Sequence, residues 1–121
     1  MNRLDCCLID SLGVEDAILI NVKEKVFLIQ SSYEDDYEVW LWIEYSGHED
    51  MVKNVLDSNT TIRELIDTCK FKVAYRYYND FDNIKLMPDV KPFGFDLPTQ
   101  DSYIPNLVLN EDELEELKAS I

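Results

Sequence analysis

The sequence predicts an α+β domain: a mainly antiparallel β-sheet with two short mid-chain helices and a C-terminal helix. Three observations lead to this prediction. Short apolar segments with strand patterns occur before residue 46 and again after residue 70, apolar residues recur at helical spacing between them, and an acidic amphipathic segment ends the chain. The 121 residues, 46 % of them hydrophobic, suit one core, so residues 1–121 are expected to form a single domain.

The first half of the chain predicts three strands. Residues 16–22 and 26–31 are short and β-branched, and the polar residues 23–25 between them predict a β-hairpin. Residues 37–45 alternate most clearly, with Tyr37, Val39, Leu41, Ile43 and Tyr45 on one face and Glu38, Trp40, Trp42 and Glu44 on the other. Because both faces carry apolar residues, we expect a central strand that is partly covered on each side. Residues 4–9 fit either a strand or a helix.

Two capping boxes predict the mid-chain helices. Ser46 and Glu49 have the spacing at which each side chain satisfies a backbone N–H group of the first turn, and Thr61 and Glu64 repeat that spacing. Apolar residues follow each box on one helix face: Met51, Val52, Val55 and Leu56 in the first helix, and Ile62, Leu65 and Ile66 in the second.

The second half of the chain predicts a further strand pair. Residues 70–78 alternate again, residues 79–80 (Asn-Asp) form a turn signal, and residues 84–87 can return as the partner strand. Four prolines between residues 88 and 105 predict an irregular surface segment.

The end of the chain predicts a short extended piece at residues 107–109 and then a helix. Asn110 can cap this helix, whose acidic first turn suits the helix dipole. Leu114, Leu117 and Ile121 form its narrow apolar stripe.

The net charge of −14 narrows the classes of partner. Such a field repels nucleic acid and acidic membranes and favours basic proteins. We therefore expect a protein partner with a basic surface and no direct binding of nucleic acid or membrane. No segment approaches the roughly 18 apolar residues of a membrane span. The first residues lack the apolar stretch of a secretion signal, so a cytoplasmic protein is expected.

The residues that carry most catalytic and cofactor chemistry are sparse. Cys6, Cys7 and Cys69 form no plausible disulfide framework and are expected to be free thiols. His48 is the only histidine, and nothing in the sequence would orient it toward Cys69 as a catalytic base. The sequence contains no glycine-rich phosphate loop and no spaced set of metal ligands. We predict no catalytic residue, no cofactor, no metal site and no enzymatic activity.

A base-free acidic segment is the predicted partner-binding surface. Residues 33–50 contain seven acidic residues and no Lys or Arg, and a second base-free acidic cluster lies within 110–117. Tryptophan is enriched at binding hot spots. The predicted partner-binding residues are Glu34, Asp35, Asp36, Glu38, Trp40, Trp42 and Glu44.

Three alternatives for these residues stay open. The tryptophans could be packed beneath a helix or the proline-rich segment. The carboxylates could serve solubility alone. The acids at 34–36 could hold a divalent cation or form a solvated hairpin tip.

The leading functional hypothesis is a non-enzymatic interaction module. It would be an inhibitor of phage or mobile-element type, or an immunity or antitoxin-like protein, whose carboxylates imitate a phosphate backbone in the basic groove of a nucleic-acid-binding protein. The alternative is a regulatory or structural subunit of a larger bacterial assembly, contacted through residues 71–78 or the terminal helix.

Three short motifs follow the strand at 37–45. They are Thr61-Ile-Arg-Glu-Leu-Ile66, Leu97-Pro98 and Tyr103-Ile104-Pro105. This order resembles a family of uncharacterised small bacterial proteins, a domain of unknown function, over residues 14–109. Thr61 and Glu64 stand where that family is expected to have Ser and Asp. The resemblance implies one domain and a bacterial or phage setting, and it implies no activity, cofactor or catalytic residue.

Overall fold

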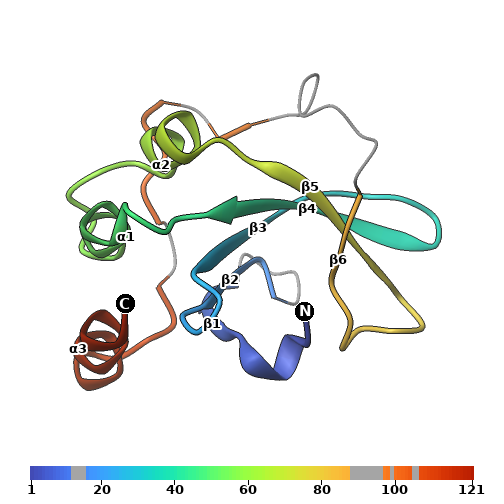
Figure 1. The fold of residues 1–121 in the computed structure, drawn as a ribbon, viewed down its shortest axis with the longest axis horizontal. Helices are drawn as coiled ribbons and strands as arrows, with labels where there is room; N and C mark the ends of the chain where they lie inside the picture. The colour runs from blue at the N-terminus through green and yellow to red at the C-terminus, as the bar shows by residue number, and fades with distance from the viewer. Residues whose placement is uncertain (12–15, 88–96, 99, 105–106) are drawn as a thin grey trace.

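The computed structural model describes residues 1–11, 16–87, 97–98, 100–104 and 107–121. These residues form a six-stranded antiparallel sheet and three α-helices, which confirms the predicted α+β class (Figure 1). The elements in chain order are a 3₁₀ turn η1 (Arg3–Asp5), β1 (Cys7–Asp10), β2 (Ile18–Asn21), β3 (Val26–Tyr33), β4 (Tyr37–Glu44), α1 (Glu49–Leu56), α2 (Ile62–Cys69), β5 (Lys72–Tyr77), β6 (Lys85–Leu86) and α3 (Glu111–Ser120). Each strand pairs with its neighbours along the chain, in the order β1-β2-β3-β4-β5-β6.

The predicted hairpin is β2–β3, and its turn is held by Asn21. The Asn21 side-chain oxygen accepts a hydrogen bond from the Glu24 backbone N–H at 2.9 Å. Lys25 takes a left-handed φ of 57° at the end of the turn. Strand pairing then places Ile18 opposite Ile29, with both side chains buried.

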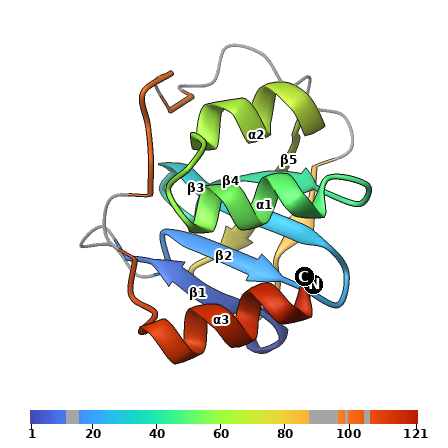
Figure 2. The same cartoon turned by 90° about the vertical axis from the view of Figure 1, so that its left-hand side faces the viewer.

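The alternation of the predicted central strand is confirmed in β4, which lies between β3 and β5. Leu41 and Ile43 point into a large core that α1, α2 and α3 cover. Trp40 points into a smaller core on the opposite face. In Figure 2, α1 and α2 lie in front of the sheet and α3 lies beside β1 and β2.

The smaller core is covered by the N-terminal residues and the segment before β6. Residues 1–3 run antiparallel to residues 82–84: the Ile84 N–H donates to the Met1 carbonyl and the Arg3 N–H donates to the Asp82 carbonyl, each at 2.9 Å. Met1 and Ile84 also pack against this core. The N-terminal segment is therefore a cover over the face that carries Trp40.

The capping prediction at Ser46 and Glu49 is wrong. Helix α1 begins at Glu49, and His48 occupies the N-cap without a side-chain cap hydrogen bond. Gly47 takes a φ of 88°, and the turn that it forms keeps Ser46 outside the first turn of the helix. The Glu49 carboxylate binds Lys25 Nζ at 2.7 Å and the Gly47 N–H at 3.3 Å. The ion pair with Lys25, aided by backbone hydrogen bonds, lowers the pKa of Glu49 to about 2.

The other two caps are confirmed to different extents. The Thr61 hydroxyl accepts from the Glu64 N–H at 3.2 Å, but the Glu64 carboxylate binds the Thr60 hydroxyl instead of closing a capping box. Asn110 and Glu113 form a complete capping box at the start of α3, where Asn110 was predicted as the cap.

The remaining predicted elements fall partly outside the described residues. Residues 4–9 combine both expected forms, because η1 ends at Asp5 and β1 begins at Cys7. Residues 107–109 lie alongside β1, where the Val108 N–H donates to the Ile9 carbonyl at 3.0 Å. The predicted proline-rich irregular segment lies largely outside the described residues. Among the described helices, none has the length and apolar character needed to cross a membrane.

Tyr45 gives a stability prediction. Its side chain is fully buried, and its hydroxyl has no hydrogen-bond partner among the described residues. Burial raises the pKa of Tyr45 to about 12. A buried hydroxyl without a partner costs about 1–3 kcal/mol, so Tyr45→Phe should raise the unfolding free energy by about 1 kcal/mol in urea denaturation. Tyr45→Leu, which leaves a cavity, serves as the control and should be less stable than Tyr45→Phe. A Tyr45→Phe protein less stable than the parent would contradict this account.

Candidate protein-binding site

The structure divides the seven predicted partner-binding residues among three places. Glu34, Asp35 and Asp36 are exposed in the turn between β3 and β4. Glu38 and Trp40 are 4 % and 0 % exposed, and neither lies on the surface. Trp42 and Glu44, half-buried and exposed respectively, lie at the other end of β4. A strand rises about 3.3 Å per residue, so Glu44 lies roughly 25 Å from the turn. The seven residues therefore do not share one surface.

Glu38 is buried because it belongs to an internal ion-pair network. Its carboxylate accepts from Arg76 Nε at 2.7 Å. Arg76, which is fully buried, also pairs with Asp16 at 3.1 Å, and Asp16 pairs with Arg3 at 2.6 Å. Two cations and two carboxylates thus connect the N-terminal cover, β4 and β5.

Aromatic rings enclose the Arg76 guanidinium. Its central carbon lies 5.1 Å from the ring centre of Trp40 and 4.6 Å from that of Phe81. Such cation–π contacts strengthen when water is excluded. Trp40 is therefore buried below the N-terminal cover and against Arg76. It does not pack beneath one of the three described α-helices, which was one of the alternatives left open by the sequence.

The network predicts sensitivity to acid. The hydrogen bond from Arg3, together with that from Arg76, lowers the pKa of Asp16 below its usual value. A carboxyl group with a lowered folded-state pKa stabilises the protein fully above its unfolded-state pKa, about 3.9, and loses that contribution as the pH falls through the folded-state pKa. The stability difference between the parent and Asp16→Asn should therefore be largest near pH 7 and should shrink below about pH 4. Urea denaturation from pH 7 to pH 3 measures it, and an equal difference at both ends would contradict the prediction.

Other acids of the base-free segment are neutralised by cations from elsewhere in the chain. Glu44 pairs with Lys72 at 2.7 Å, and this contact lowers the pKa of Glu44. Glu49 pairs with Lys25, as described above. By contrast, no ion pair among the described residues involves Glu34, Asp35 or Asp36. Among the seven predicted residues, the three turn carboxylates are thus the acids that are exposed and in no ion pair with a described cation.

Aromatic side chains gather beside these carboxylates. Tyr37, Tyr75 and Tyr77 make edge-to-face contacts, with ring centres 5.2 to 6.2 Å apart. Four of the eight large apolar or aromatic side chains that are exposed in the described part of the chain lie here, namely Tyr33, Tyr77, Tyr78 and Phe81, at 37 to 52 % exposure. We call residues 33–37, 75 and 77–81 the acid–aromatic tip.

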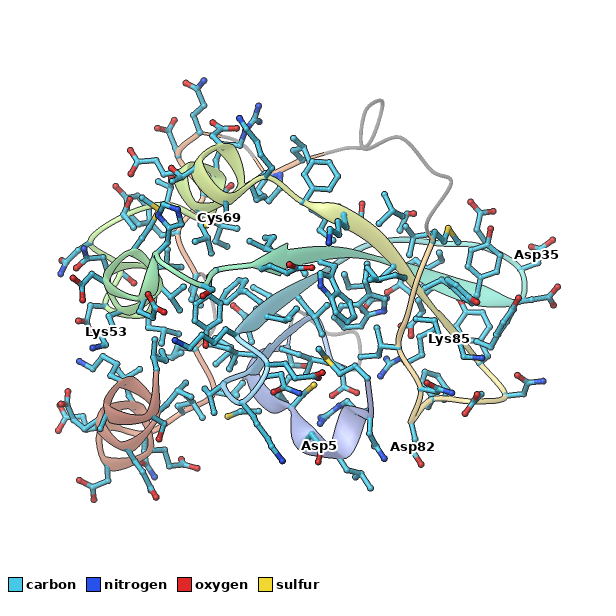
Figure 3. All side chains as sticks on the ribbon, viewed as in Figure 1. Asp5, Asp35, Lys53, Cys69, Asp82 and Lys85 are labelled. Carbon is cyan, nitrogen blue, oxygen red and sulfur yellow. The ribbon has the colours of Figure 1, made fainter. Side chains whose placement is uncertain are left out.

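A shallow pocket of about 420 Å³ lies in the acid–aromatic tip, lined by Asp35, Asp36, Tyr77, Tyr78 and Asn79. The Tyr78 N–H donates to the Asp36 carbonyl at 3.1 Å, and the Tyr78 hydroxyl donates to the Glu34 carbonyl at 3.2 Å. In Figure 3, Asp35 lies at the far end of the hairpin, away from the helices. Partial dehydration, and then the negative charges around it, raise the pKa of Tyr78. The pocket is therefore lined by acidic and aromatic residues in a negative field, which is a combination that attracts cations.

The tip was only half predicted. The turn acids were predicted as a charge cluster, whereas residues 70–78 were predicted only as an alternating strand. What brings them together is the β4–β5 register, in which Tyr37 lies opposite Tyr77. The one signal available in the sequence was the density of tyrosines in the two alternating segments.

The residues considered for catalysis are three cysteines and one histidine. Cys6, Cys7 and Cys69 are half-buried free thiols, and burial raises the pKa of Cys69, which is the opposite of nucleophile activation. His48 is exposed at the N-cap of α1. In the part of the chain that the structure describes, no group of three or more His, Cys, Asp or Glu side chains could hold a metal ion.

Comparison with family models, with curated proteins and with solved structures gave no match to this chain. The resemblance to uncharacterised small bacterial proteins therefore stays a prediction. The case for function depends on the geometry of the acid–aromatic tip.

Proposed function

We propose that the chain is a protein-binding module whose acid–aromatic tip engages a basic surface of another protein. One observation carries this proposal: three exposed carboxylates, in no ion pair with a described cation, adjoin a concentration of exposed aromatic side chains. Aromatic residues are enriched at protein interfaces, and tyrosine and tryptophan are enriched among hot spots. Carboxylates and aromatic faces together recognise lysine and arginine side chains.

The second acidic cluster, on α3, lacks the aromatic half of this combination. Leu114 and Leu117 of α3 pack against the large core. Lys118 pairs with Glu115 and with Asp57, both at 2.8 Å, so part of the α3 charge is neutralised. The tip is therefore the better candidate for specific binding.

The structure also bears on how the acids would act. Mimicry of a phosphate backbone needs an extended row of free carboxylates, but Glu38, Glu44 and Glu49 are each paired with a cation of this chain. We therefore propose a compact contact at the tip in place of a long phosphate-like row. A basic nucleic-acid-binding protein, inhibited or neutralised by this contact, remains the proposed class of partner.

The alternative, a regulatory or structural subunit contacted through residues 71–78 or the terminal helix, has less support. Strand β5 lies between β4 and β6, so its backbone is not a free sheet edge where it pairs with them. Its exposed side chain Tyr77 already belongs to the tip. Binding through α3 is an outcome that the experiment below would detect.

Site-specific photo-crosslinking tests the proposal. A photoreactive phenylalanine analogue is placed at Tyr77 in one protein and at Val108, which is also exposed but adjoins β1, in a second protein. In lysate of the native host, Tyr77 should yield a defined cross-link to a basic protein, lost at high salt because screening weakens the attraction. Cross-links from Val108 alone, or the same products from both positions, would contradict binding at the tip.

A further inference from the structure

We infer that the pocket lined by Asp35, Asp36, Tyr77, Tyr78 and Asn79 receives one arginine side chain of the partner. This inference rests on the proposed function and names the anchoring contact. Two aspartates and two tyrosines line the pocket, and no ion pair with a described cation of this chain engages either aspartate. The Tyr77 ring contacts Tyr37, whereas the Tyr78 ring contacts Phe81.

The lining favours arginine over lysine. A guanidinium group is planar, stacks on aromatic faces and donates two parallel hydrogen bonds to a carboxylate. An ammonium group is a compact and strongly hydrated point charge that loses more on leaving water. A pocket lined by aromatic as well as acidic residues therefore favours binding of the planar guanidinium group.

The pocket is held in shape before a partner arrives. The backbone of Tyr78 is bonded to that of Asp36, and the Tyr78 hydroxyl is bonded to the backbone of Glu34, so β5 and the turn are joined across the pocket. The ion pair between Arg76 of β5 and Glu38 of β4 also joins the two strands that lead into the pocket. A preformed pocket lowers the ordering cost of binding.

The same chemistry already operates inside this protein. Arg76 is held by the carboxylates of Asp16 and Glu38 and by the aromatic faces of Trp40 and Phe81. The pocket is lined by residues of the same two kinds, acidic and aromatic, and lies at the surface. We therefore expect an external guanidinium to bind by the same contacts.

Titration of the ¹⁵N-labelled full chain with three peptides tests the inference by NMR. The peptides are nine residues long, Gly/Ser-based, and carry three arginines, three lysines or three citrullines. The arginine peptide should shift the amide signals of residues 35–36 and 77–79 and bind at least about threefold more tightly than the lysine peptide, while citrulline, which is uncharged, should not bind. Equal or tighter binding of the lysine peptide at the tip would overturn the arginine pocket and leave the proposed function standing. Shifts confined to α3, or no binding by either cationic peptide, would overturn both.

Two variants sharpen the result. Tyr78→Leu should remove the preference for arginine, whereas Tyr103→Leu, which removes an exposed tyrosine outside the tip, should leave it unchanged. The dispersion of the NMR signals reports whether each variant is folded. If Tyr78→Leu does not fold, Asp36→Asn takes its place and should weaken binding of the arginine peptide. An unchanged arginine preference in the folded variant would overturn the inference.

Discussion

The Arg76→Met variant is expected to lose about 3–5 kcal/mol of unfolding free energy, because removal of one member of a buried ion pair leaves a buried charge, here that of Glu38, without its cation. Arg76 is fully buried and pairs with Glu38, whereas Asp16 pairs with both Arg76 and Arg3. The variant also loses the cation–π contacts to Trp40 and Phe81. Urea denaturation at pH 7 measures the loss.

Two controls separate burial from charge. Lys72→Met removes the ion pair between Lys72 and Glu44, which are 60 % and 51 % exposed. This variant should lose less than about 1 kcal/mol of unfolding free energy. Adding Glu38→Gln to Arg76→Met removes the carboxylate charge that has lost its cation and should recover part of the stability. An Arg76→Met protein no less stable than Lys72→Met would show that the network contributes nothing.

Charge reversal at the tip should abolish partner binding. Glu34, Asp35 and Asp36 lie in an exposed turn, so their replacement by lysine should leave the fold intact while turning attraction for a basic surface into repulsion. The expected result is loss of the Tyr77 cross-link and an affinity for the arginine peptide below detection. Circular dichroism and the unfolding midpoint verify that the fold persists.

A matched variant controls for net charge. Asp112, Glu115 and Glu116 of α3 are exposed, and their reversal to lysine changes the net charge by the same amount. If steering by overall charge were the whole effect, both triple variants would bind equally poorly. If the α3 variant still binds the partner and the tip variant does not, the loss of binding is due to the tip. The reverse pattern would refute binding at the tip.

Much of the fold could be predicted because its signals are local. The alternation of residues 37–45 is a property of neighbouring residues, and it correctly placed Leu41 and Trp40 on opposite faces. Asn110 capped α3 as predicted because a cap depends on a few adjacent residues. The capping box at Ser46 failed for an equally local reason, since Gly47 turned the chain before the helix began.

The candidate site was predicted less well because it depends on strand pairing. Glu38 looked like one more surface acid, and only the register that places it opposite Arg76 shows that it is buried. The same register brings Tyr77 beside Tyr37 across two intervening helices. Pairing between segments so far apart cannot be read from periodicity, so the acids were recognised and their neighbours were not.

Hydrogen–deuterium exchange of the full chain, free and bound to the partner that the Tyr77 cross-link identifies, tests the central claim most directly. The account predicts slowed exchange in residues 33–38 and 75–81 of the complex, with residues 111–120 unchanged. Slowed exchange confined to residues 111–120, with the tip unaffected, would contradict it.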